Sequence, residues 1–129
     1  PETHAIPNFI AAALAGRPIP LYWNGEQVRD FVYVEDLARA HSKVLGLDGH
    51  HIFNVGAERG ARIRDVLDTI LRLTESRSTI SDLGPRAGDV AENYASAEQL
   101  RAATGWQPRV ELEEGLRRTV EWFRRAHGR

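Results

Sequence analysis

The 129-residue sequence contains neither cysteine nor methionine. Without cysteine the chain can form no disulfide bond and no cysteine-ligated zinc site, and this absence agrees with a reducing cytoplasm. Without methionine the chain has no initiator residue, and it begins at Pro1. We therefore expect it to be a piece of a longer protein.

Long apolar runs and an excess of charge of either sign are also absent. No run of eighteen apolar residues occurs, so we expect no segment that spans a membrane. The net charge is −1, with 17 Lys and Arg against 18 Asp and Glu. This balance provides no general attraction to nucleic acid or to acidic membranes. We expect a cytoplasmic protein with neither nucleic acid nor a membrane among its partners.

Several enzyme motifs are missing as well. No glycine-rich dinucleotide loop, P-loop or nucleophile elbow appears in the sequence. The segment 56–60 could approach a phosphate, but a plain strand-to-helix turn is favoured. His50 and His51 would point to opposite faces of a strand, so we predict no metal site. Asp30 is expected to pair locally, and Glu35 with Asp36 to open a helix, where acidic residues are favoured.

The apolar pattern predicts a mixed α/β chain with a small sheet and four or five helices. The helices are expected near residues 6–14, 37–45, 63–71, 96–105 and 112–123, the strands at 30–34 and 52–55, and an extended segment at 20–23. Residues 76–95 are expected to be irregular. No repeat or internal boundary is visible, so residues 1–129 are interpreted as one unit.

Two arginines are the most informative polar residues. Arg29 follows a glycine-containing turn, and Arg86 lies in a loop between proline and glycine, shortly before Asp89. The planar guanidinium can bind a diphosphate through two parallel donors, and a nearby carboxylate can accept hydrogen bonds from ribose hydroxyls. The alternative is two surface arginines in ordinary salt bridges. These residues alone leave both interpretations open.

Four segments, in this order, resemble the extended short-chain dehydrogenases that act on nucleotide sugars. They are GEQVRDFVYVEDLARA at 25–40, FNVG at 53–56 before a helix, RAGDVAENYA at 86–95 before a helix and GWQP at 105–108, and LEEGLRRTVEWF at 112–123. They extend over nearly the whole chain. The chain therefore resembles the C-terminal part of an NAD-dependent epimerase/dehydratase of the UDP-glucose 4-epimerase type.

The resemblance implies that the N-terminal Rossmann domain of such an enzyme is missing here. That domain carries the glycine-rich NAD loop and the catalytic Tyr-x-x-x-Lys pair. Tyr22, Tyr33 and Tyr94 are not followed by lysine four residues later, so none of them can replace that tyrosine. We expect no catalytic and no NAD-binding residue in this chain. The full-length protein would oxidise its sugar at C4 with NAD, and this chain alone would be inactive.

The same resemblance assigns candidate substrate-binding residues. They are Arg29 and Arg86 for the diphosphate, Asp89 near the ribose, Pro20, Leu21 and Tyr22 along the base, and Asn8 near the phosphates. The expected ligand is a UDP- or dTDP-linked sugar. One departure is Trp23, since relatives commonly have glycine after the tyrosine. Trp23 could narrow the nucleotide pocket or cover the side that faces the missing domain.

The resemblance also implies an exposed apolar surface. Residues 29–55 are expected to pack on the missing Rossmann domain, so the isolated chain is expected to self-associate, and the full-length protein to form a homodimer. A non-catalytic module that only holds nucleotide sugars is the alternative function. A structural domain that has lost the ligand is a third possibility. The presence or absence of the Tyr-x-x-x-Lys pair upstream would separate the first two.

Overall fold

The computed structural model describes residues 4–127. In chain order its elements are α1 (Ala5–Ala15), β1 (Ile19–Leu21), the 3-10 helix η1 (Trp23–Gly25), β2 (Val28–Arg29), α2 (Val34–Val44), β3 (Ala61–Arg62), α3 (Ile63–Thr74), β4 (Ile80–Asp82), β5 (Glu92–Asn93), α4 (Glu98–Thr104) and α5 (Leu112–Ala126). This is the small α/β fold that the sequence predicts, with five α-helices where four or five were expected, and each predicted helix is confirmed within a few residues.

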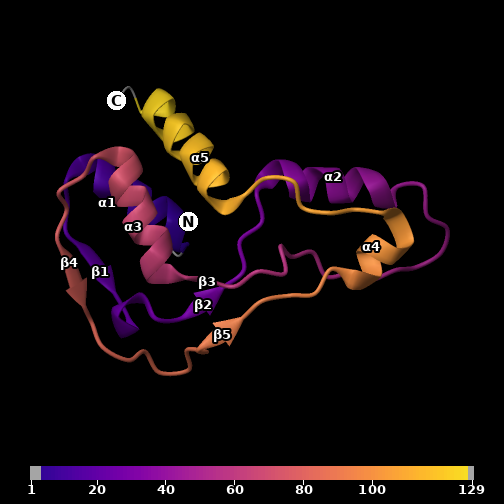
Figure 1. Cartoon of the computed structure of the whole chain (residues 1–129), viewed down its shortest axis with the longest axis horizontal. Coiled ribbons are helices and arrows are strands. Elements are labelled where there is room, and N and C mark those ends of the chain that lie inside the picture. Colours follow the sequence, from indigo (N-terminus) through magenta and orange to yellow (C-terminus); the bar gives the residue numbers. More distant parts are fainter. Residues whose placement is uncertain (1–3, 128–129) are drawn as a thin grey trace.

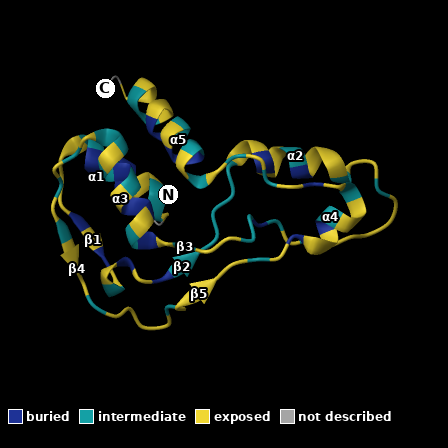
Figure 2. Cartoon of the chain, viewed as in Figure 1, coloured by how far each residue is buried: buried dark blue, intermediate teal, exposed yellow. Residues whose placement is uncertain are grey.

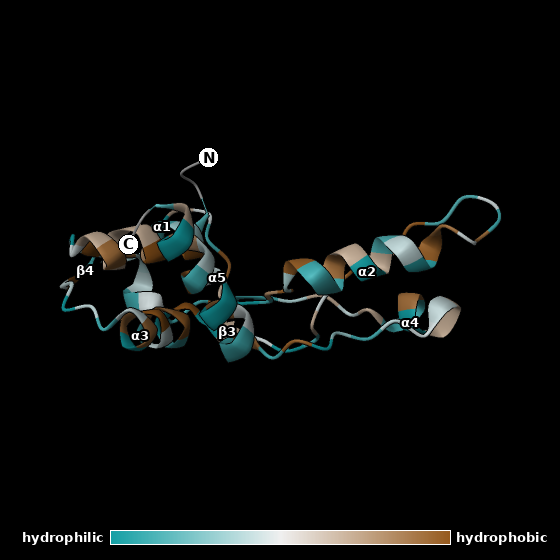
Figure 3. Ribbon diagram, turned by 90° about the horizontal axis from the view of Figure 1, so that it is seen from above, coloured by the Kyte–Doolittle hydropathy of each residue, from teal (hydrophilic) through white to brown (hydrophobic). Residues whose placement is uncertain are grey.

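The elements form a main body and an arm (Figure 1). The main body contains α1, α3 and α5 together with β1 and β4. The arm consists of residues 34–56 and 96–108, which include α2 and α4, and it extends to one side in both views (Figures 1 and 3). The short strands β2, β3 and β5 lie between the two parts.

Two apolar clusters stabilise these two parts. The helices of the main body bury Phe9, Ile10, Val66, Leu67, Ile70, Leu116 and Val120 against Ile19 and Leu21 of β1. Together with Ala12 and Ala13 of α1, these residues recur at three- and four-residue intervals along each helix, so one face of each helix turns inward (Figure 2). The arm has a smaller cluster of its own, formed by Ala40, Ala97, Leu100 and the fully buried Trp106.

The strands form two small sheets. β1 pairs in parallel with β4, with Leu21 opposite Asp82. In the second sheet, β2 lies between β3, which is antiparallel to it, and β5, which is parallel. Val28 and Arg29 therefore have partners on both sides, and the loop that precedes β5 is brought beside β2.

The two strands predicted at 30–34 and 52–55 are wrong. The strand lies earlier, at Val28–Arg29, and residues 51–57 have no regular structure. The Asp30 carboxylate accepts hydrogen bonds from the backbone N–H groups of Ala57 (3.0 Å), Glu58 (3.3 Å) and Ala95 (3.3 Å). These bonds pull the chain into a turn. Among residues 4–127 no neighbouring strand is available to pair with 31–33 or 52–55, so their apolar, β-branched pattern has no ladder to join.

Asp36 joins the arm to the last helix. Its side chain is almost fully buried, and its carboxylate accepts hydrogen bonds from Arg109 N–H (3.0 Å), Val110 N–H (3.0 Å) and Arg39 Nη2 (2.7 Å). Its backbone carbonyl accepts a fourth from Trp106 Nε1 (2.9 Å). One residue of α2 thus holds the whole segment that leads into α5. Along residues 4–127, no helix has the length and apolar character needed to cross a bilayer.

We expect Asp36→Ala to destabilise the protein by about 2–4 kcal/mol, because it leaves two backbone donors without their acceptor and removes the ion pair of Arg39. Urea denaturation measures this change. Asp48→Ala is the control, since Asp48 is exposed and its side chain makes no ion pair with the other described residues. The control should change the free energy of unfolding by less than about 0.5 kcal/mol. Equal effects of the two substitutions would contradict this role of Asp36.

The pKa of Asp36 predicts how stability depends on pH. Burial alone would raise this pKa. The hydrogen bonds from Val110, Arg109 and Arg39 together lower it by more, so the pKa of Asp36 lies below its ordinary value. A lowered folded pKa stabilises the protein above the unfolded pKa of about 3.9, and this contribution is lost as the pH falls through the folded pKa. We expect the stability gap between wild type and Asp36→Asn to shrink below about pH 4. A gap that widens on acidification would be contrary to this expectation.

Candidate functional site

A cavity of about 440 Å³ opens between α1, β1, β2 and the loop after β4. Six of the seven residues predicted to bind substrate line it: Pro20, Leu21, Tyr22, Arg29, Arg86 and Asp89. They come from three separate parts of the sequence. Asn8 does not line the cavity; it lies on the exposed side of α1. Trp23 does not line it either, so it does not narrow this cavity.

A tight turn sets the distance between two walls of the cavity. Trp23 and Asn24 have positive φ values of 52° and 50°, and Gly25 follows at 74°. A Cβ on Gly25 would lie 2.7 Å from the backbone nitrogen of Arg64, so only glycine fits there. Asp82 Oδ1 accepts a hydrogen bond from Asn24 N–H (3.0 Å) and stabilises the turn. The turn places Tyr22 on one side of the cavity and the strand β2 on another.

Arg29 connects β2 to the loop that carries Asp89. Its Nη2 donates to Asp89 Oδ1 (2.5 Å), and its Nη1 donates to the carbonyls of Val28 (2.8 Å) and Val90 (2.7 Å). The side chains of Arg29 and Asp89 are 25% and 16% exposed, so the pair is partly shielded from water. Asp89 Oδ1 also accepts from Val90 N–H (3.0 Å), while no donor among residues 4–127 contacts Oδ2. The sequence analysis left open that Arg29 forms an ordinary surface salt bridge. Arg29 does form a salt bridge, but the pair is partly buried.

Arg86 is placed differently from Arg29. Its guanidinium carbon lies 5.3 Å above the centre of the Tyr22 ring, and it forms no ion pair with any residue from 4 to 127. A backbone hydrogen bond from Asp89 N–H to Arg86 O (3.2 Å) holds the two residues in one turn. The cavity therefore contains one arginine that is largely occupied by protein acceptors and one that is available for a further anion.

The wall formed by β1 offers apolar surface and few polar groups. Pro20 has no N–H group, and the carbonyl of Leu21 already accepts a hydrogen bond from Leu83 N–H (2.6 Å). The Tyr22 ring is 38% exposed. A flat aromatic ligand group could lie against this wall, but the Leu21 carbonyl has only its second lone pair to offer.

Gln27 is a polar cavity residue that the sequence analysis did not identify. It is 9% exposed and lines the cavity two residues before Arg29. The signal that could have found it is the two-residue period of a strand, which places residues 27 and 29 on the same face. Its side-chain oxygen is buried and receives no hydrogen bond from the described residues.

The glycine turn at 56–60 does not fit a dinucleotide. A Cβ on Gly56 would lie 2.5 Å from Asp30 Oδ2, and one on Gly60 would lie 2.4 Å from Val28 Cγ1. These glycines are therefore packed against the protein itself, which leaves no open cradle for a phosphate. Within residues 4–127, no group of three or more His, Asp or Glu side chains is placed to hold a metal ion.

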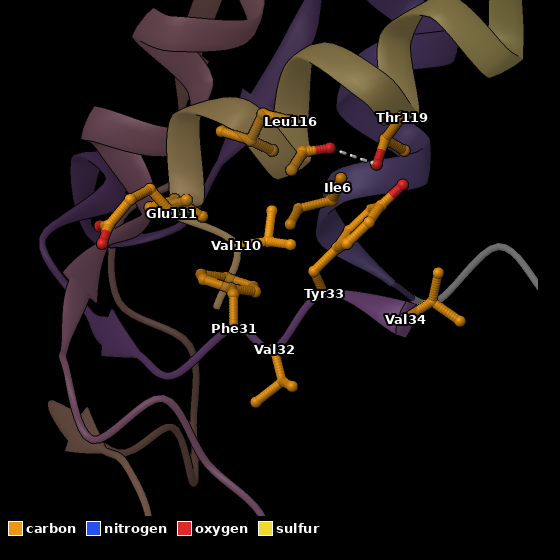
Figure 4. A pocket seen from close by; sticks show the side chains of 11 residues that line it. Ile6, Phe31, Val32, Tyr33, Val34, Val110, Glu111, Leu116 and Thr119 are labelled. Atoms are coloured by element: carbon orange, nitrogen blue, oxygen red, sulfur yellow. Dashed lines mark hydrogen bonds between the residues drawn. The ribbon is translucent and has the colours of Figure 1, made fainter. Parts of the chain in front are cut away.

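A second, apolar cavity of about 290 Å³ lies where residues 31–34 approach the start of α5. Figure 4 shows the side chains of Phe31, Tyr33 and Val110 directed into it, with Val34 at its edge. It contains no arginine or lysine. This cavity is therefore suited to apolar contact and not to an anionic ligand.

Comparison with known proteins shows which family this chain resembles. Residues 2–56 match the NAD dependent epimerase/dehydratase family. The dTDP-glucose 4,6-dehydratase of Salmonella typhimurium is 35% identical over 127 residues, which cover 92% of this chain and 35% of that protein.

Solved structures agree with this result. The UDP-glucose 4-epimerase of Thermotoga maritima, solved with UDP-glucose, is 31% identical, with a TM-score of 0.92 over 98% of this chain and 41% of that one. The enzyme of the same name from Thermus thermophilus, solved with NAD, is 34% identical, with a TM-score of 0.84 over 93% of this chain and 40% of that one. The chain thus spans about two fifths of the structures it matches. The fold agrees with the C-terminal part of an extended short-chain dehydrogenase, and the chain is similar to members of the NAD-dependent epimerase/dehydratase family.

Proposed function

We propose that this chain holds the nucleoside diphosphate of a UDP- or dTDP-linked sugar, as the substrate-binding part of an NAD-dependent epimerase or dehydratase. The observation that carries the proposal is the meeting of Arg29, Arg86 and Asp89 with an apolar wall in one cavity. The relatives named above act on, or are solved with, nucleotide sugars or NAD. We propose that this chain shares with those relatives the binding of a nucleotide sugar.

Arg86 supplies the main contact to the diphosphate in this proposal. Its position above the Tyr22 ring is a cation–π contact at a partly exposed site, which contributes only about 0.5–1 kcal/mol. A paired hydrogen bond to phosphate oxygens is stronger and has the geometry of the guanidinium fork. The diphosphate can therefore draw Arg86 away from Tyr22 at a small cost, and the ring is then free to contact the base.

Arg29 and Asp89 have supporting roles in binding the nucleotide. Three of the five N–H groups of Arg29 are already donated to protein acceptors, so its Nε and one Nη2 hydrogen remain for a phosphate. Asp89 would repel a phosphate, but its charge is balanced by Arg29. Asp89 Oδ2 is instead suited to accept a hydrogen bond from a ribose hydroxyl.

In this proposal NAD binding and the redox chemistry belong to a part of the protein outside this chain. The packed glycines at 56 and 60 offer no loop for a dinucleotide, and no tyrosine has a lysine four residues later. In this proposal the chain contributes binding energy at the nucleotide end, remote from the carbon that reacts. That energy serves to position the sugar.

Removing Arg86 tests the proposal. We expect Arg86→Ala to weaken binding of UDP-glucose or dTDP-glucose by about 1.5–3 kcal/mol, roughly 10- to 100-fold in Kd, because a charged donor pair is lost. Isothermal titration calorimetry measures it. Arg125→Ala is the matched control, because Arg125 is exposed on α5, which contributes no residue to the cavity.

Unchanged affinity in Arg86→Ala would refute the diphosphate assignment of this residue. Absence of binding by the wild-type protein to both nucleotide sugars would refute the proposed function as a whole. An equal loss in Arg125→Ala would indicate a general effect of charge, which also speaks against a specific site.

We also propose that the arm packs against the part of the protein outside this chain, as expected for residues 29–55. Its large apolar side chains are unusually exposed: Val34 by 66%, Leu45 by 84% and Ile52 by 80%. Large apolar side chains this exposed, gathered in one part of the fold, mark a surface that contacts another protein part. The arm has few buried residues of its own to compensate for this exposure.

The isolated 129-residue chain should therefore self-associate through the arm. Sedimentation velocity at about 100 μM should show dimers or larger species, because association would cover the exposed apolar side chains of the arm. The double substitution Leu45→Glu and Ile52→Glu should shift the chain toward the monomer. A wild-type chain that is entirely monomeric under these conditions would contradict the proposed role of the arm.

A further inference from the structure

We infer that Asp82 is a positioning residue for the candidate nucleotide site. Its carboxylate holds the turn that carries Tyr22 and the loop that carries Arg86 in one arrangement before the ligand arrives. The inference rests on the proposed nucleotide-binding function and adds to it a residue that does not itself line the cavity. It is carried by two hydrogen bonds that one oxygen of Asp82 accepts, one from each of these segments.

The Tyr22 turn and the Arg86 loop begin at the same edge of one sheet. β1 and β4 are parallel, and Leu21, the last residue of β1, lies opposite Asp82, the last residue of β4. Tyr22 directly follows β1, and Arg86 follows shortly after β4. Both segments therefore leave the sheet side by side (Figure 1). Asp82 lies at the point where these two walls of the cavity separate.

One carboxylate oxygen of Asp82 contacts both segments. Asp82 Oδ1 accepts hydrogen bonds from Asn24 N–H (3.0 Å) in the turn and from Gly84 N–H (2.9 Å) in the loop. A backbone bond from Trp23 N–H to Gly84 O (2.9 Å) supports the same connection. Because a carboxylate is a charged acceptor, its bonds are stronger than those between neutral groups. Asp82 thus links the two walls directly.

The turn needs this support because its backbone is strained. Trp23 and Asn24 have φ values of 52° and 50°, in the left-handed region that residues with a side chain adopt only at a cost in free energy. Such conformations persist where the surrounding structure holds them, and they are frequent at ligand-binding sites. The N–H of Asn24 belongs to the peptide that joins the two strained residues. The bond to Asp82 therefore holds the strained peptide itself.

The same bonds set the position of Arg86 relative to Tyr22. The guanidinium carbon of Arg86 lies 5.3 Å from the centre of the Tyr22 ring. Without the acceptor at Asp82 the turn is free to relax, and Tyr22 then leaves the loop that carries Arg86. The fraction of the protein that is ready to bind falls, and the measured Kd rises in inverse proportion. Asp82 acts through these two residues and makes no contact with the ligand.

Asp82→Ala tests the inference in calorimetry with UDP. We expect the Kd to rise about fivefold, as for the loss of about one net hydrogen bond. Electrostatics alone predicts the opposite sign, because removing a negative charge favours an anionic ligand. Asp82→Asn removes the same charge but keeps an oxygen acceptor, so it should bind UDP within about twofold of wild type. Asp48→Ala, at an exposed aspartate of the arm, is the control and should leave the Kd unchanged.

A double-mutant cycle identifies the residue through which Asp82 acts. If Asp82 positions Arg86, the loss caused by Asp82→Ala should fall below about twofold when Arg86 is already replaced by alanine. A general structural role of Asp82 would instead give the same loss with and without Arg86. The cycle therefore separates positioning from structural support.

Other results would overturn the inference. If wild type binds UDP and Asp82→Ala binds it equally well or more tightly, this inference fails while the proposed function stands. An equal loss in Asp82→Asn would assign the effect to the charge, and equal losses in both arms of the cycle would assign it to general support. An unfolded Asp82→Ala protein, detected by circular dichroism, would show that Asp82 supports the whole fold. If wild type binds no UDP, the proposed function itself fails, and this inference fails with it.

Discussion

The candidate site depends on the ion pair between Arg29 and Asp89. This pair joins residues sixty positions apart and, with the bonds from Arg29 to the Val28 and Val90 carbonyls, holds the loop after β4 against β2. Without it, the loop that carries Arg86 would be held by short strand pairings and by bonds at its start, such as Trp23 N–H to Gly84 O (2.9 Å). Because the pair is partly buried, loss of either partner leaves a charge in a poorly hydrated position. The cavity is thus closed by the same residue that was expected to bind the ligand.

Arg29 and Arg86 have different roles in this arrangement. Arg29 is fixed, its charge is largely balanced, and few of its donors remain. The side chain of Arg86 lies over the Tyr22 ring, forms no ion pair with residues 4–127, and can move to an anion. A fixed arginine preserves the shape of the site before the ligand arrives, so less ordering is required on binding. Gln27, in the same wall, is held by its backbone carbonyl, which accepts a hydrogen bond from Ile63 N–H.

The sequence predicts the helices well because each has a continuous apolar stripe, such as Ile63, Val66, Leu67 and Ile70 on α3. It predicts the strands poorly because a strand needs a partner as well as a pattern. Residues 52–55 are apolar and β-branched, yet none of the described residues pairs with them as a strand. Asp36 illustrates a different limit. Its place in the first turn of α2 can be predicted from the sequence, but its hydrogen bonds to Arg109 and Val110 join residues more than seventy positions apart.

The site residues were grouped by resemblance and not by local chemistry, which left Arg29 and Arg86 as possible surface residues. Gln27 was missed because a single neutral amide has no distinctive pattern, and its significance comes from burial. The most direct measurement of the central claim is a crystal structure of the protein with UDP-glucose. The account predicts the diphosphate beside Arg86 and Arg29, with Arg86 displaced from Tyr22. A diphosphate bound elsewhere, with Arg86 still above Tyr22, would contradict it.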